Sequence, residues 1–389
     1  MMQLASRTIV VLVGFALFLL GCGSSGGSAG GSAGTGGVGG VGGRGGAGGA
    51  PRLVVTADWL NQSLTLFDYD KLIDGQSDAS EALVDTIDLS SWEPGPIELE
   101  ITPDGKTAVV SVGPAFFDGS GVTNMLVGSP EVPPGGALLI VDLESGEATE
   151  VATEDVPLGI AISSDGDVAY TANYGTIDAP GNTLSVIDIP RRTLITEITL
   201  DGRPEQVALS PDGTLGVVNI AGGSGGIHVF ETDTLVMSPL LPTGNDPSDV
   251  TFLDDETRVV VANSFSLDVT LVDTSDPSAP FVIESVMIGG GFPYGVTYMP
   301  SRDQLILPTG TGSNLVVIDV DGDLLTPSEP RLLPGGAFPL TAAVDPSESF
   351  AFVAHIADKT LSIIDLETGA LRGVSWLENP GPAYAAVQP

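Results

Sequence analysis

The chain of 389 residues has one cysteine, Cys22, and only two histidines, His228 and His355. A single cysteine allows no intrachain disulfide and no covalent c-type haem motif. Two histidines are too few for a multi-histidine metal cluster. Basic residues are also scarce, because 13 Lys and Arg stand against 50 Asp and Glu, a formal net charge of −37. Phosphate contacts need a basic surface, so this composition argues against nucleic-acid binding and against adhesion to anionic headgroups.

The chain is instead rich in a repeat. Short alternating strands, each closed by an acid, recur seven times at a period of forty-odd residues. The closing acids are Asp68, Asp142, Asp188, Glu231, Asp273, Asp319 and Asp365. Alternation followed by a turn predicts β-strands. A repeat of this length built only from strands and turns is typical of a β-propeller, with one repeat for each blade.

A second element, a proline followed by a short strand and an Asp-Gly-type turn, sets the phase of the blades. Its copies begin at Pro96, Pro157, Pro204, Pro247, Pro293, Pro339 and Pro382. The last copy supplies only a first strand, whereas the sequence from Arg52 begins with a second-strand pattern. The C-terminal strand is therefore predicted to complete a blade with three N-terminal strands, which removes free sheet edges. The predicted fold class is all-β, a seven-bladed propeller of four-stranded antiparallel blades over residues 51–389.

These repeats resemble the YVTN-type (YncE-like) propeller repeat of bacterial and archaeal surface proteins. The similarity is closest at Pro157–Asp188, which reads PLGIAISSDGDVAYTAN and then TLSVID. It is good at Pro204–Asn219 and Asp358–Leu371, and it extends over nearly all of the predicted propeller. The resemblance implies the fold, but little about function, since such propellers have many unrelated roles.

The N-terminal segment predicts an envelope lipoprotein. Arg7 precedes a short apolar core, and Leu19-Leu20-Gly21-Cys22 has the form of a lipobox. The core is too short to span a membrane and is typical of a signal peptide, here residues 1–21. The resemblance to bacterial lipoproteins implies acylation (palmitate or a similar chain) of Cys22, and more than one chain makes such anchoring stable. Residues 22–50 are rich in Gly, Ser and Ala and are expected to form a flexible tether. Gly23 after the cysteine favours the outer membrane or cell surface over the inner membrane.

Most residues that suggest chemistry have a structural interpretation in the repeat. Asp is favoured in turns because it bonds its own backbone, so the closing acids are interpreted as turn formers. His355 takes the repeat position of Asn173 and Asn263, and His228 takes that of Ser185 and Ser362. The two histidines are therefore not expected to share a metal. The segment Asp319–Asp323 lacks the Gly and Glu of an EF-hand and is predicted to be a tight turn. We expect no metal and no cofactor.

The inner strands give the first candidate site. The second and fourth residues after each blade proline are expected to face the central channel, while the alternating residues, such as Leu99 and Ile101, pack between blades. Most channel-side residues are small. The exceptions are Glu98, Glu100, Gln206, Asp249 and Tyr384. They either form an acidic mouth that binds a cation, a sugar or a cationic peptide, or only hydrate an open channel end.

The second candidate is an insertion in the first proline-led unit, Gly113–Gly136, whose Phe116 and Phe117 are more apolar than a solvated loop needs. Loops that interrupt a repeat often bind partners. These rings either cover the rim of the propeller or anchor a partner.

The sequence thus predicts a lipid-anchored, monomeric propeller that binds a protein or glycan partner without catalysis. The alternative is a propeller enzyme of lactonase or hydrolase type that uses the acidic channel mouth. A purely structural spacer is a third interpretation.

Overall fold

The structure is a computed structural model that describes residues 50–75, 79–114, 136–176, 179–222, 225–310, 312–334, 338–357, 360–374 and 381–389. Pro51–Pro389 form one compact unit. The predictions for Cys22, for the tether, and for Phe116 and Phe117 lie outside the described residues.

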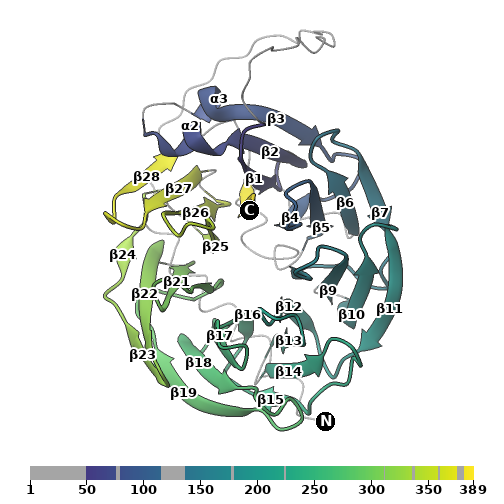
Figure 1. Cartoon of the computed structure of the whole chain (residues 1–389), viewed down its shortest axis with the longest axis vertical. Coiled ribbons are helices and arrows are strands. Elements are labelled where there is room, and N and C mark those ends of the chain that lie inside the picture. Colours follow the sequence, from purple (N-terminus) through teal and green to yellow (C-terminus); the bar gives the residue numbers. More distant parts are fainter. Residues whose placement is uncertain are drawn as a thin grey trace, which may run out of the picture. The chain divides into compact units, whose positions relative to one another are not determined.

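The unit consists of seven antiparallel sheets arranged around a central axis (Figure 1). From the axis outward, blade 1 contains β29 (Pro382–Val387), β1 (Leu53–Asp58), β2 (Ser63–Asp68) and β3 (Leu83–Asp88), blade 2 contains β4 (Pro96–Ile101), β5 (Thr107–Val112), β6 (Ala137–Asp142) and β7 (Ala148–Val151), and blade 3 contains β8 (Ile160–Ile162), β9 (Val168–Gly175), β10 (Pro180–Asp188) and β11 (Thr193–Thr199). Blade 4 contains β12 (Pro204–Leu209), β13 (Leu215–Ile220), β14 (Gly226–Glu231) and β15 (Leu241–Pro242), and blade 5 contains β16 (Pro247–Phe252), β17 (Arg258–Asn263), β18 (Asp268–Asp273) and β19 (Phe281–Met287). Blade 6 contains β20 (Thr297–Met299), β21 (Gln304–Thr309), β22 (Asn314–Asp321) and β23 (Leu324–Pro327), with β24 (Arg331–Leu332) also paired to β22, and blade 7 contains β25 (Pro339–Val344), β26 (Phe350–His355), β27 (Thr360–Asp365) and β28 (Leu371–Val374).

The predicted seven-bladed propeller and its closure are therefore confirmed. The C-terminal strand β29 pairs antiparallel with β1, with Ala57 opposite Tyr384. The Gln388 side chain strengthens this closure, because its Oε1 accepts the Leu53 N–H at 2.7 Å and its Nε2 donates to the Gly105 carbonyl of blade 2 at 2.6 Å. Blade 1 thus joins the two ends of the domain.

The core consists of apolar layers between neighbouring blades. Leu99 and Ile101 of β4 pack with Val55 and Leu66 of blade 1, as the alternation predicted. Equivalent layers fill the other blade junctions. Full burial of each such side chain is worth about 1.5–3 kcal/mol, so these layers hold the blades in register around the axis.

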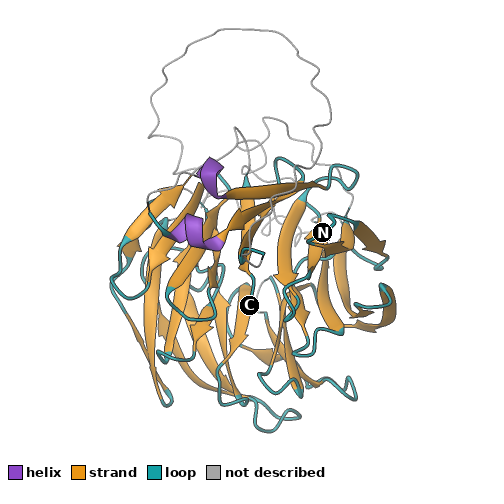
Figure 2. Ribbon diagram, turned by 45° about the horizontal axis from the view of Figure 1, so that its top comes forward, coloured by secondary structure: helices purple, strands orange, loops and turns teal. Residues whose placement is uncertain are grey.

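The acid-ended strands do lead into turns. Five of the seven acids accept turn or helix backbone N–H groups: Asp68, Asp142, Asp188, Asp273 and Asp365. One connection differs from the strand repeat, because two short helices, α2 (Tyr69–Ile73) and α3 (Ala79–Ala82), precede β3 (Figure 2). Asp68 caps α2, and Tyr69 and Leu72 are buried, which explains why this connection is helical.

The two histidines lie in different blades at the repeat positions predicted for them. His355 ends β26 opposite Thr360, as Asn263 ends β17 opposite Asp268. Its Nε2 lies 2.8 Å from the Ser362 hydroxyl, and His228 Nδ1 lies 2.9 Å from the Ser238 carbonyl oxygen. Both side chains are buried, so they serve the blades' internal packing.

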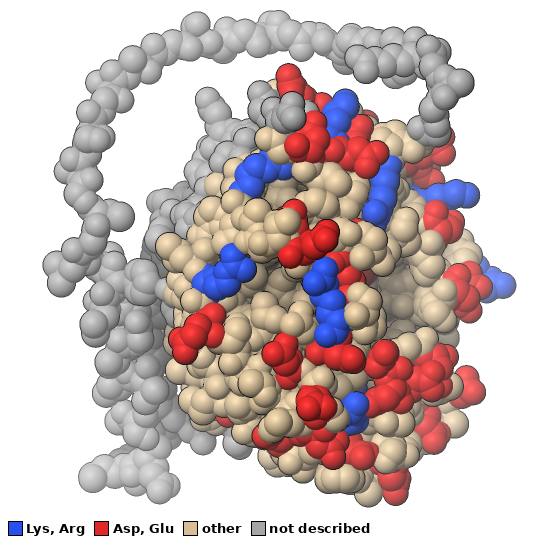
Figure 3. All heavy atoms as spheres, turned by 60° about the vertical axis from the view of Figure 1, so that its left-hand side comes forward, with Lys and Arg blue, Asp and Glu red and all other residues tan. Residues whose placement is uncertain are grey.

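Within the described ranges, no helix is long and apolar enough to cross a membrane. On the face shown in Figure 3, basic side chains are scattered singly, and acidic side chains gather into larger groups.

Candidate functional site at the channel

The inner strands surround the propeller axis, and the region that their side chains line is here called the channel. In five inner strands the pairing shifts directly after the blade proline, for example between Pro96 and Glu98 of β4. Such a bulge places two residues opposite one and turns an extra side chain toward the same face. The proline end of the channel is therefore lined more densely than strict alternation predicts.

Glu98 links three blades at this end of the channel. Its side chain is 2% exposed. Oε1 accepts the Ile160 N–H of blade 3 at 3.0 Å, and Oε2 accepts the Gln206 amide of blade 4 at 2.5 Å. Gln206 reaches across Gly159 of blade 3, where a Cβ atom would lie 2.4 Å from Gln206 Oε1. The bond therefore depends on that glycine.

Asp249 repeats part of this arrangement on the other side of the channel. Oδ2 accepts the Val296 N–H of blade 6 at 2.8 Å, and Oδ1 accepts the Val250 N–H at 2.8 Å. Burial raises the pKa of Asp249 to about 7, although both backbone hydrogen bonds lower it.

Glu100 lies deeper and is half-buried. Burial, followed by the neighbouring Asp249 carboxylate, raises the pKa of Glu100 to about 7. Burial also raises the pKa of Glu98 well above its usual value, against the Gln206 hydrogen bond that lowers it. Burial raises the pKa of the Tyr384 hydroxyl, and Glu98, Glu100 and Asp249 raise it further. These residues come from blades 1, 2 and 5, so their mutual influence shows that the structure brings the predicted channel residues together.

The sequence interpretation missed a further carboxyl, Glu205, the residue directly after Pro204. Burial raises its pKa well above the usual value, and Asp246 and Asp249 add to this, whereas Arg203 lowers it. Arg203 itself lies over the Tyr174 ring, 4.3 Å from the centroid, and donates to the Tyr174 hydroxyl at 3.1 Å. The bulge after the proline is the local feature that adds Glu205 to the channel, and strict alternation places it elsewhere.

The channel mouth is chemically divided. Glu205, Arg203 and Asp246 lie in blades 4 and 5 or in the segments that lead into them. An apolar cluster of Trp59, Ile97, Leu158, Tyr174, Leu340, Ile356 and Ala383 comes mainly from blades 7, 1, 2 and 3. Trp59 fixes this cluster through a hydrogen bond from Nε1 to the Gly113 carbonyl at 3.1 Å.

The channel carboxyls differ in what they can bind. Glu98 accepts one backbone N–H and the Gln206 amide, and Asp249 accepts backbone N–H groups alone. Glu100 and Glu205 accept no hydrogen bond from the described residues. Within the described ranges, no three His, Cys, Asp or Glu side chains are grouped to hold a metal ion. Carboxyls spread around an axis suit an extended ligand better than a single ion.

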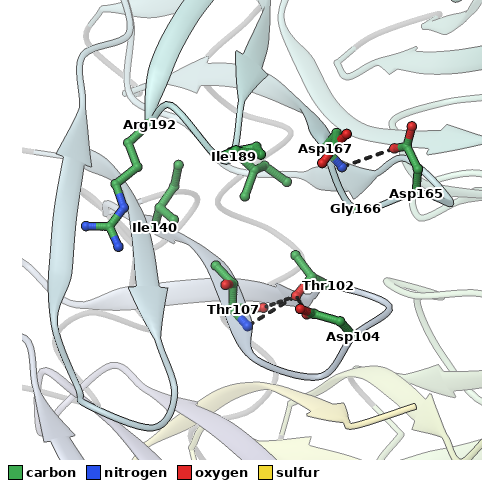
Figure 4. Close-up of a pocket in the computed structure, with 10 residues that line it drawn as sticks. Thr102, Asp104, Thr107, Ile140, Asp165, Gly166, Asp167, Ile189 and Arg192 are labelled. Carbon is green, nitrogen blue, oxygen red and sulfur yellow. Dashed lines mark hydrogen bonds between the residues drawn. The ribbon is translucent and has the colours of Figure 1, made fainter.

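A pocket lies at the other end of blades 2 and 3, beside their Asp-Gly turns (Figure 4). Its volume is about 250 Å³, and it is lined by Asp104, Asp165, Asp167 and Arg192, among others. Asp104 and Asp165 each accept hydrogen bonds within their own Asp-Gly turns. The Arg192 guanidinium donates a hydrogen bond to the Thr149 hydroxyl at 2.6 Å. These side chains are explained by turn formation, so the channel is the stronger candidate site.

No protein family and no curated protein matches this sequence. Solved structures do match the fold. A functionally unknown protein from Desulfotomaculum acetoxidans superposes with a TM-score of 0.66 at 15% identity, covering 86% of this chain and 98% of that chain. The periplasmic gluconolactonase of Pseudomonas aeruginosa has a TM-score of 0.64 at 17% identity, with coverage of 87% and 99%. Hydrazine synthase of Kuenenia stuttgartiensis has a TM-score of 0.58 at 17% identity, with coverage of 83% and 94%.

At these identities the likeness shows the propeller fold alone. The resemblance to YVTN-type repeats therefore remains a prediction, and so does every role that the channel residues have in binding.

Proposed function

We propose that this protein is an envelope-anchored binding module whose channel takes an extended cationic ligand, such as a polyamine or a lysine-rich peptide, without catalysis. The observation that carries the proposal is the set of channel carboxyls with raised pKa values, near which Arg203 is the only cation among the described residues. A bound ammonium group would supply the missing countercharge and would favour the ionised carboxylates.

The depths of the carboxyls favour a linear cation. Counted along their inner strands, Glu205 is the second residue, Asp249 the third and Glu100 the fifth. At about 3.3 Å per residue, Glu205 and Glu100 are separated by roughly 10 Å along the channel. Amine groups separated by short methylene chains match such spacing. Tyr384 and Tyr294 lie near these carboxyls, because after burial Glu98 and Glu100 raise the pKa of Tyr384 and Glu205 raises that of Tyr294. Their rings are the candidate cation–π partners of the ligand.

The test is a calorimetric titration of spermidine into the full chain at pH 8 and low salt. We expect saturable binding that Glu100→Gln weakens at least tenfold. Glu144→Gln is the matched control, because Glu144 is exposed and lies outside the channel. Equal affinity in wild type and Glu100→Gln, or no binding to wild type, would overturn the proposal.

A second candidate is a lactone hydrolase. One observation favours it: Glu100 and Asp249 both have a pKa of about 7, the range in which a carboxyl serves as a general acid or base. Turnover of δ-gluconolactone by the full chain, abolished by Glu100→Gln and retained by Glu144→Gln, would establish this activity. We expect no turnover above the uncatalysed rate.

A further inference from the structure

The channel contains two structurally equivalent groups of three residues, each formed by the second residue after the proline of three successive blades. The first group is Glu98, Gly159 and Gln206, in blades 2, 3 and 4. The second is Asp249, Gly295 and Thr341, in blades 5, 6 and 7. In both, the acid accepts the N–H of the residue that follows the glycine, Ile160 at 3.0 Å and Val296 at 2.8 Å. The repeat has therefore built the same acceptor twice.

In the first group, the protein completes this acceptor with its own side chain. Gln206 extends over Gly159 and donates its amide to Glu98 Oε2 at 2.5 Å. The backbone of Gln206 is held for this by Asn219, whose Oδ1 accepts the Gln206 N–H at 2.6 Å. The glycine is essential because a Cβ atom there would also lie 2.5 Å from the Glu205 carbonyl oxygen.

In the second group, the corresponding arm is too short. Thr341 lacks the two further side-chain atoms that carry the Gln206 amide to its acid. The Thr341 hydroxyl oxygen is instead buried without a hydrogen-bond partner among the described residues. Among the described residues, Asp249 accepts only backbone N–H groups. Gly295 packs against Thr341 as Gly159 packs against Gln206, because a Cβ atom at Gly295 would lie 2.8 Å from Thr341 Cα and 2.7 Å from the Leu340 carbonyl oxygen.

The second group has more carboxyl groups around it than are needed to bind a neutral amide such as that of Gln206. Glu100 is close enough for the Asp249 charge to raise its pKa, and the Tyr384 ring is close enough to respond to both carboxylates. A hydrogen-bond donor of a ligand that binds beside Asp249 therefore contacts two carboxyls and an aromatic ring. These surroundings suit a protonated amine.

Deepening the proposed function, on which it rests, we propose that Asp249, Gly295 and Thr341 form the seat for a terminal ammonium group of the ligand, which takes the place that the Gln206 amide occupies beside Glu98. The chain fills one of its two equivalent acceptors itself and leaves the other for the ligand. Asp249 is the acceptor of the seat, and Thr341 determines its specificity by being short.

The test is to let the protein fill the second seat as well. Thr341→Gln introduces an amide arm that extends over Gly295 toward Asp249. Because Asp249 is one methylene shorter than Glu98, the double variant Asp249→Glu with Thr341→Gln reproduces the first group completely. Thr341→Ala shortens the arm and keeps the seat open. Thr193→Gln, on the exposed outer strand β11, controls for the substitution itself.

Spermidine is titrated into the full-chain wild type and each variant at pH 8, and thermal unfolding verifies that each is folded. We expect Thr341→Gln and the double variant to lower the affinity at least tenfold and Thr341→Ala to lower it far less than Thr341→Gln. Thr193→Gln, outside the seat, should change it less than threefold. Spermidine binding that Thr341→Gln leaves unchanged, or that Thr341→Ala weakens equally, overturns the seat while the proposed function stands. No spermidine binding to wild type overturns both.

An NMR titration of the Asp249 carboxyl gives a readout that needs no ligand. If the introduced amide reaches Asp249, the Asp249 pKa falls in Thr341→Gln relative to Thr341→Ala, since a hydrogen bond to the charged form favours ionisation. The same Asp249 pKa in the two variants would show that the arm does not reach the carboxyl and would contradict the geometry of the seat.

Discussion

Replacing Glu100 by Gln is expected to stabilise the folded protein at pH 8 and to leave its stability unchanged at pH 4. The pKa of Glu100 rises from 4.5 to about 7 on folding, first because of burial and then because of Asp249. One pKa unit corresponds to about 1.4 kcal/mol. Ionised Glu100 therefore costs the folded state about 3 kcal/mol, a cost that the neutral amide avoids.

The direction with pH follows from where the proton is bound. Below pH 4.5 the carboxyl is protonated in both the folded and the unfolded chain, and it carries no ionisation penalty. Between pH 4.5 and about 7 the unfolded chain loses the proton first, so stability falls as the pH rises. Above pH 7 the full penalty is present. The gain from Glu100→Gln should therefore appear progressively between pH 4.5 and 7.

Urea unfolding of the full-chain wild type, Glu100→Gln and Glu144→Gln at pH 4, 6 and 8 measures this difference. Thermal unfolding gives a second measure of the same difference. For a unit of roughly 340 residues, a gain of about 3 kcal/mol in unfolding free energy corresponds to a rise of about 4 °C in Tm. Glu144→Gln should stay within about 0.5 kcal/mol of wild type at each pH, as expected for an exposed site. A Glu100→Gln variant no more stable than wild type at pH 8, or equally stabilised at all three pH values, would refute the reasoning.

One substitution and one truncation test the framework of the channel. Gly159→Ala places a Cβ atom 2.5 Å from the Glu205 backbone carbonyl oxygen and blocks the Gln206 side chain from Glu98. Urea unfolding should therefore show that the free energy of unfolding falls by about 1–3 kcal/mol. An unchanged urea midpoint would contradict the close approach. Truncation before Pro382 removes β29 and exposes the β1 edge to solvent, so size-exclusion chromatography should show aggregation, whereas a stable monomer would contradict the closure.

The repeat made the architecture predictable. Blade prolines and acid-ended strands give the strand order, and the incomplete copy at Pro382 gives the closure that β29 forms with β1. The strand positions of His228 and His355 were predictable for the same reason, because equivalent residues in a repeat have equivalent neighbours. Helices α2 and α3 were not predicted, since they lie in a connection where the repeat is interrupted.

The channel was predictable only in part. Alternation brought Glu98, Glu100 and Asp249 to one face, but it did not show that Glu98 is tied to Gln206 two blades away, because that bond depends on the absence of a side chain at Gly159. Glu205 was missed because the bulge after Pro204 changes which side chains face the channel. Raised pKa values arise from burial and from charges on other blades, and neither can be read from one strand alone.

The most direct test of the central claim, that channel carboxyls bind a cationic ligand, is the number of protons released when spermidine binds at pH 7. It is measured by calorimetry in buffers of different ionisation enthalpy. Glu100 and Asp249, with pKa values of about 7, should each be about half protonated before binding and ionised afterwards. We predict the release of about one proton from these two carboxyls at pH 7 and less at pH 8, where both are mostly ionised before binding. Binding without proton release at pH 7 would contradict the account.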